Sequence, residues 1–186
     1  MLRRFARWLL RTGGWTAVGG IPPEPKAVFI AAPHTSNWDG FWAIVYKVAV
    51  GIDVNFFAKR ALFWFPLGNI LRALGGIALD RARAGSAVQQ AITMFEESES
   101  FYFGLAPEGT RALKTGWKSG FYRIATGANV PVYLGLLDYG ARRIGIGPKI
   151  ELSGDQDADL AVIRAFYKDI KGHRPELASP VVFHAK

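Results

Sequence analysis

The sequence predicts an α/β fold, namely a single layered domain with a largely parallel central sheet flanked by helices, preceded by an N-terminal amphipathic helix. Strand-like apolar runs alternate with helix-like segments across most of the chain, as in parallel sheets joined by helical crossovers. The 186 residues are half apolar, which is enough for one sizeable core. We therefore expect residues 26–186 to form the domain, and residues 1–25 to form a separate helix with a turn-rich connector.

The first eleven residues predict an amphipathic helix with a basic arc and an apolar arc. Trp8 lies near the boundary between the arcs. This pattern favours a helix that lies in the interface of an anionic membrane, with an ordinary terminal helix packed on the domain as the alternative. The arginines are Arg3, Arg4, Arg7 and Arg11, and the apolar residues are Leu2, Phe5, Ala6, Leu9 and Leu10.

The predicted strands are short apolar runs, rich in aromatic and β-branched residues and bounded by glycine, proline or charged residues. They alternate with the helices described next, so most of them are expected to pair in parallel. The runs are residues 27–33, 54–60, 76–81, 101–107 and 130–139, with one or two further strands in residues 142–152.

The predicted helices show apolar residues at helical spacing or the usual start and stop residues. Asn37 is a plausible N-cap of the first of them. A later helix begins near Pro66 and stops at Gly75. The helices are residues 37–50, 66–74, 86–98, 117–129 and 157–170, and the rest is read as a tail.

The composition limits the kinds of partner and site that we expect. There are 23 Lys and Arg against 15 Asp and Glu, a formal charge of +8, which favours an anionic partner. The basic residues are dispersed and no nucleic-acid-binding motif occurs, so we do not expect nucleic acid as a partner.

Cysteine is absent, which excludes disulfides, thiolate metal sites and a cysteine nucleophile, and we expect no metal. The longest apolar stretch, residues 61–79, is interrupted by Pro66, Asn69 and Arg72, so we expect no membrane span.

The stretch "APHTSNWDG" joins the first buried strand to the next helix and contains one of the three histidines. Asp39 follows His34 by five residues and falls in the first turn of that helix. A carboxylate there can accept a hydrogen bond from one imidazole nitrogen, which leaves the other as a general base toward a hydroxyl. The alternative is a loop histidine without a role and an acid favoured by the helix dipole.

A second polar cluster, "APEGTR", follows the strand at residues 101–107. Gly109 allows close backbone approach to a ligand, Thr110 offers a hydroxyl and an amide, and Arg111 offers a fork that matches phosphate. Glu108 can orient Arg111 or a substrate hydroxyl. The alternative is a β-turn with a solvated arginine.

Further cations follow other strand ends. Arg81 ends "GGIALDR", Lys59 ends another strand, and Lys118 follows "EGTR". Each can be an ordinary solvated charge, but together they favour one cleft that binds an anion. The apolar stretch Phe56–Leu74 suggests a floor for an acyl groove, with plain core packing as the alternative.

Four motifs in order resemble those of the glycerolipid acyltransferase family, which includes lysophosphatidic acid acyltransferase. "PHTSNWD" resembles its His-x4-Asp motif, "GGIALDR" its second, "PEGTR" its third, and "VPVYLGL" its apolar fourth segment. The order of the four is more specific than any one of them. The chain departs from the common pattern at Pro33, where Asn is usual, and at Ala112, where Ser is frequent.

The resemblance implies an O-acyltransferase of phospholipid biosynthesis on the cytoplasmic face of the cell membrane, peripheral or monotopic. His34 would be the general base and Asp39 its orienting partner. The acceptor phosphate would be held by Gly109, Thr110 and Arg111. Glu108, Arg81 and Lys118 complete the set of site residues. The donor is acyl-CoA or acyl carrier protein, no bound cofactor is needed, and the expected acceptor is a lysophospholipid, first of all 1-acylglycerol-3-phosphate.

Two alternatives remain open at this point. One is an acyltransferase that acts on another lipid or glycolipid acceptor. The other is a basic peripheral membrane protein without catalysis, which explains the charge and the N-terminal helix equally well. Consumption of a thioester with release of free thiol separates the second alternative from an enzyme.

Overall fold

The computed structural model describes residues 1–79 and 87–184. Within these residues, seven strands form one sheet in the order β1-β7-β6-β2-β5-β3-β4. All neighbouring pairs are parallel except β6 and β7, which are antiparallel. The strands are β1 Thr16–Val18, β2 Lys26–Ala32, β3 Val54–Lys59, β4 Gly76–Leu79, β5 Phe101–Leu105, β6 Val132–Asp138 and β7 Arg143–Ile150.

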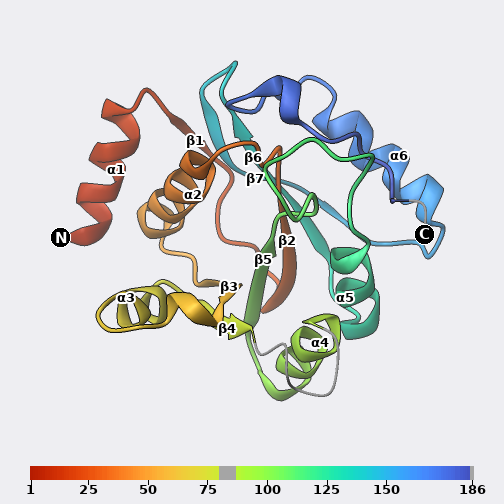
Figure 1. The fold of residues 1–186 in the computed structure, drawn as a ribbon, viewed down its shortest axis with the longest axis horizontal. Helices are drawn as coiled ribbons and strands as arrows, with labels where there is room; N and C mark the ends of the chain where they lie inside the picture. The colour runs from red at the N-terminus through yellow and green to blue at the C-terminus, as the bar shows by residue number, and fades with distance from the viewer. Residues whose placement is uncertain (80–86, 185–186) are drawn as a thin grey trace.

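Helices cover both faces of the sheet, so the domain has three layers (Figure 1). The predicted α/β class and the largely parallel sheet are confirmed. The helices are α1 Leu2–Thr12, α2 Asn37–Val50, α3 Leu67–Ala73, α4 Ala87–Glu97, α5 Gly120–Ala128 and α6 Gln156–Tyr167, with short 3-10 turns η1 Arg60–Leu62 and η2 Pro175–Leu177.

The central strand β2 alternates its side chains between two apolar clusters, as a strand buried on both faces must. Val28 and Ile30 pack with α4, α5 and α6, whereas Ala27 and Phe29 pack with α1 and α2. Because β2 lies between β6 and β5, its carboxyl end lies at the middle of the sheet edge. Loops that follow parallel strands meet at that edge, where ligands bind in folds of this class.

The N-terminal helix packs on the domain. The buried residues of α1 are Ala6 and Leu10, which join the cluster under α2. The Arg7 Nε donates to the Ala49 carbonyl at 3.0 Å, and the Arg3 guanidinium lies against Gly51. These two arginines therefore lie at the carboxyl end of α2, where a cation is stabilised by the helix dipole.

The structure differs from the expected elements in local details. A strand of three residues, β1, lies inside the predicted connector and pairs with β7. The sequence did not predict this strand, because so short a strand gives no readable pattern. The α2 N-cap is Ser36, with extended backbone, and Asn37 is already helical. The region 142–152 forms the single strand β7. Among the described residues, no helix is long and apolar enough to cross a membrane.

Candidate active site

The His34–Asp39 pair is set by the way α2 begins. Asp39 occupies the third position of the helix and folds back so that its Oδ2 accepts the Thr35 and Ser36 amides at 2.7 and 2.8 Å. Ser36 in turn accepts the Trp38 amide, which completes a capping box. The same Oδ2 lies 3.3 Å from the His34 Nδ1. The five-residue spacing is therefore the length of chain that returns the carboxylate to the histidine ring.

The Asp39 carboxylate is only 2% exposed and each of its oxygens is occupied. Its Oδ1 accepts the Tyr139 hydroxyl at 2.9 Å. Burial by itself raises the pKa of this carboxyl, but hydrogen bonds from the His34 ring, the Tyr139 hydroxyl and the two amides outweigh it and lower the pKa below its ordinary value. Asp39 is therefore ionised at neutral pH and fixes the Nδ1 proton of His34, which leaves Nε2 as the basic nitrogen.

Tyr139 follows β6, the neighbour of β2, and contacts the site from there. Its ring packs edge-on against Trp15 and His173, with centroids 4.9 and 5.0 Å away. Burial, and then the hydrogen bond to Asp39, raise the pKa of its hydroxyl well above the ordinary value. Tyr139 therefore stays protonated at neutral pH and donates to Asp39.

Glu108 lies behind the histidine. It is buried, and its Oε1 accepts the His34 main-chain amide at 2.6 Å. Its Oε2 accepts the Ser179 amide at 3.2 Å. Both oxygens bind main-chain groups, so this geometry favours a positioning role for Glu108 over the substrate contact expected from the sequence.

The rest of the third motif forms an exposed loop. Gly109 has a φ of +65°, the left-handed conformation that glycine adopts most readily, and it packs against the Lys118 side chain. Thr110 Oγ1 accepts the Ala112 amide at 3.3 Å. The Arg111 side chain makes no hydrogen bond or ion pair within residues 1–79 and 87–184, so its guanidinium is available to a ligand.

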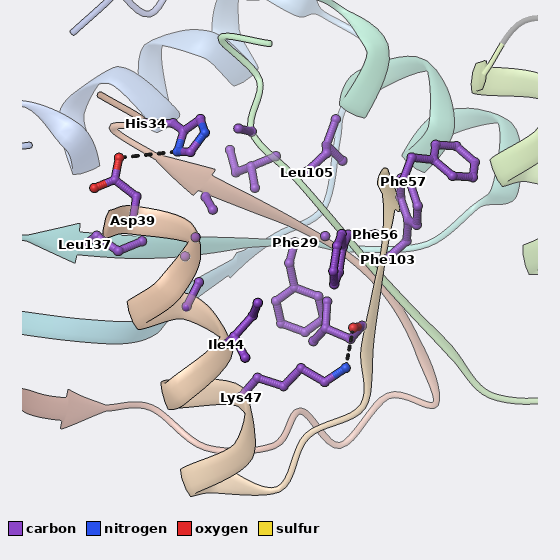
Figure 2. Close-up of a pocket in the computed structure, with 18 of the residues that line it drawn as sticks. Phe29, His34, Asp39, Ile44, Lys47, Phe56, Phe57, Phe103, Leu105 and Leu137 are labelled. Carbon is purple, nitrogen blue, oxygen red and sulfur yellow. Dashed lines mark hydrogen bonds and ion pairs between the residues drawn. The ribbon is translucent and has the colours of Figure 1, made fainter. Parts of the chain in front are cut away.

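A cavity of about 790 Å³ adjoins the pair, and it is within the usual range for small-molecule sites. Figure 2 shows His34 and Asp39 at one end and the Lys47 side chain at the other, with Phe29, Phe56 and Phe103 between them. Lys47 Nζ donates to the Val54 and Leu74 carbonyls at 2.7 and 2.8 Å, so only its apolar stem is offered to the cavity.

Most of the residues proposed from the sequence meet at this cavity. His34, Asp39, Gly109, Thr110 and Arg111 all line it. Lys118 lies beside Gly109 without lining the cavity, Glu108 is behind it, and Arg81 lies outside the described residues. Of the apolar stretch Phe56–Leu74, the lining residues are Phe56, Phe57 and Lys59.

Sequence reasoning missed Tyr139, Lys47 and Ser179. Tyr139 directly follows a predicted strand, so the strand-end rule that selected His34 could have selected it as well. Lys47 lies within a predicted helix, and Ser179 lies in the segment interpreted as a tail. Neither position carries a local signal.

Comparison with known proteins shows the family of this chain. The model of the family described as Acyltransferase matches residues 18–133. The fold resembles the crystal structure of the 1-acyl-sn-glycerophosphate (LPA) acyltransferase PlsC from Thermotoga maritima, with a TM-score of 0.61 and 20% identity, over 90% of this chain and 76% of that one. No curated protein sequence matches significantly. Because the family model covers more than half of the sequence, including both polar clusters of the cavity, this chain belongs to the acyltransferase family.

Proposed function

We propose that this protein is an O-acyltransferase that moves a fatty acyl group from a thioester to a hydroxyl of a phosphate-bearing lysolipid, with 1-acylglycerol-3-phosphate as the first acceptor to test. The observation that carries the proposal is the position of the His34–Asp39 pair at one end of a largely apolar cavity with Arg111 in its lining. The pair supplies a base, the cavity suits an acyl chain, and the guanidinium suits a phosphate.

The proposed reaction is a direct transfer. The His34 Nε2 removes the proton of the acceptor hydroxyl as its oxygen attacks the thioester carbonyl. The carbon–oxygen bond forms, the carbon–sulfur bond breaks, and the imidazolium returns the proton to the departing thiolate. Asp39 holds the ring in the required tautomer and stabilises the imidazolium. The products are the acylated lipid and the free thiol of CoA or acyl carrier protein.

The exposed loop supports acceptor binding. The Arg111 fork can bind two phosphate oxygens, and Gly109 allows the main chain to approach them. Lys118, beside Gly109, adds a second cation. Arg81 remains a proposed member of this phosphate site on sequence grounds alone.

Membrane attachment through α1 is part of the proposal. Leu2, Phe5 and Trp8 are exposed on α1, and Phe5 stacks on Trp8 with centroids 5.6 Å apart. Arg4 and Arg11 are exposed on the same helix. Aromatic and basic residues together suit the interface of an anionic bilayer, here the cytoplasmic face of the cell membrane.

The decisive experiment is mass spectrometry of the lipid products after incubation of the protein with acyl-CoA and a panel of lyso-acceptors. The expected result is one acylated acceptor with a phosphate group, formed with an equal amount of free thiol. Transfer only to an acceptor without phosphate would reassign the Arg111 loop. Absence of thiol release with both acyl-CoA and acyl carrier protein donors would favour the non-catalytic membrane protein.

A further inference from the structure

Exposed large apolar side chains gather in the segment between β3 and β4. Within it, Phe65 is 81% exposed and Trp64 is 60% exposed. Leu62 and Ile70, on η1 and α3, are also exposed. We call these four residues the 62–70 patch. Four exposed apolar side chains within nine residues are unusual, since soluble surfaces mostly carry such residues singly.

The charged residues within the segment that carries the 62–70 patch have one sign. Residues 54–79 contain no aspartate or glutamate, and they include Lys59, Arg60 and Arg72. The Arg72 guanidinium lies over the Phe63 ring, 5.5 Å from its centroid, so this cation stays next to the aromatic residues. A basic border around exposed tryptophan and phenylalanine matches an anionic bilayer, where cations meet headgroups and rings enter the interface.

The segment that carries the 62–70 patch is directly connected to the candidate site. The segment leaves β3 directly after Lys59, which lines the cavity. Helices α1, α2 and α3 lie together on one side of the molecule, opposite α6 (Figure 1). Trp38 and Phe41, in the first turns of α2, are also exposed.

We propose that the 62–70 patch enters the interface of an anionic bilayer as a second docking element, distinct from α1. The proposal rests on the proposed function in that the lipid substrate resides in the same bilayer. Two attachments, by α1 and by the 62–70 patch, fix the orientation of the domain, so the cavity is held at the membrane. An acidic protein would match the charge, but the centre of the patch is apolar, which favours a bilayer.

The absence of cysteine makes a direct test simple. The Phe65→Cys variant carries a single thiol, which can be labelled with an environment-sensitive fluorophore. Val162→Cys is the matched control, because Val162 is 57% exposed on α6, at the far side of the molecule. The probes are vesicles of phosphatidylcholine alone and of phosphatidylcholine mixed with phosphatidylglycerol, with bound protein separated by sedimentation.

We expect the label at position 65 to shift to the blue and to lose quenching by iodide on mixed vesicles, while the label at position 162 does not change. The Trp64→Ser/Phe65→Ser double variant should bind mixed vesicles about tenfold more weakly, and Val162→Ser should bind normally. A position-65 label that stays open to iodide on sedimented protein would overturn the proposal. So would a response to acyl carrier protein without one to vesicles, or the absence of vesicle binding.

Acyl transfer to a detergent-dispersed acceptor is measured in parallel on every variant. The double variant should keep this activity, since none of its changed residues lines the cavity. A normal membrane response without transfer would refute the proposed function and leave the docking surface intact. Transfer without the membrane response would refute the docking surface and leave the proposed function intact.

Discussion

The two polar loops of the cavity differ in how firmly they are held. In the His34–Asp39 loop, the carboxylate is buried and four hydrogen-bond donors reach its two oxygens. In the Gly109–Arg111 loop, the guanidinium is exposed and makes no hydrogen bond within the described residues. Proton transfer needs fixed geometry before the substrate arrives, whereas a flexible cation can order when its anion binds. In the proposed function, the first loop accordingly sets the chemistry and the second sets the acceptor.

The largest effect is expected from His34→Ala, which removes the base from the firmly held loop. Turnover should fall by about 10²–10⁴ or more. The fold should survive, because Glu108 binds the main chain of His34 and the side chain is 25% exposed. Acyl transfer and thermal melting are the measurements. A folded variant with near-normal turnover would refute the mechanism.

Glu108→Gln tests the buried support of the same loop. One amide would face the new NH₂ group instead of an oxygen, so stability should fall by about 1–3 kcal/mol, together with kcat. The KM for the acceptor should stay close to normal. Chemical denaturation and steady-state kinetics decide the matter. A normal stability with a raised acceptor KM would instead make Glu108 a substrate ligand, as the sequence indicated.

Arg111→Lys probes the exposed loop. Lysine keeps the charge and loses the bidentate fork, so the acceptor KM should rise roughly tenfold while the donor KM stays unchanged. Stability should not change, because the guanidinium contacts no partner in the described part of the chain. Kinetics with each substrate varied in turn provide the check. A raised donor KM with a normal acceptor KM would reverse the assignment.

Tyr139→Phe should have a smaller effect on rate. Asp39 keeps the His34 ring and two amides, so kcat should fall only a few-fold, with about 1 kcal/mol of stability lost. The acceptor KM should not change, which distinguishes this variant from Arg111→Lys. If kcat falls as far as in His34→Ala, Tyr139 takes part in the chemistry itself.

Acid should reduce the contribution that the Asp39 carboxylate makes to the stability of the protein. The pKa of Asp39 is lower in the folded protein than in the unfolded chain, so its contribution to stability is present above about pH 4 and is lost as pH falls through the folded pKa. The stability gap between the native protein and Asp39→Asn should therefore narrow in acid. For Arg111→Ala, which removes a side chain without a hydrogen bond or ion pair in the described residues, the difference in melting temperature should stay constant. Denaturation at neutral and acid pH measures the stability difference of each variant from the native protein. A difference for Asp39→Asn that does not change with pH would contradict the linkage.

The sequence identified the order of the main helices and strands and the two polar loops of the cavity. Strand-end position and side-chain chemistry selected His34 and the "EGTR" loop and suggested their roles, and the resemblance implied the same roles. The Tyr139 contact was missed because it depends on β6 being the neighbour of β2, which pairs Ala32 with Leu136. The membrane role of α1 remains a prediction, and the structure adds that Arg3 and Arg7 contact the end of α2.

The His34–Asp39 pair is a local feature that the sequence determines by itself, because the capping box at the start of α2 closes over a few neighbouring residues. The groups that support this pair, by contrast, come from distant parts of the chain. Glu108 reaches the His34 amide because β2 and β5 pair in register, with Ile30 opposite Leu105. Ser179 comes from the opposite end of the chain. Contacts between residues so far apart depend on strand order and on where the chain returns, and local patterns do not encode these, so only the tertiary structure decided them.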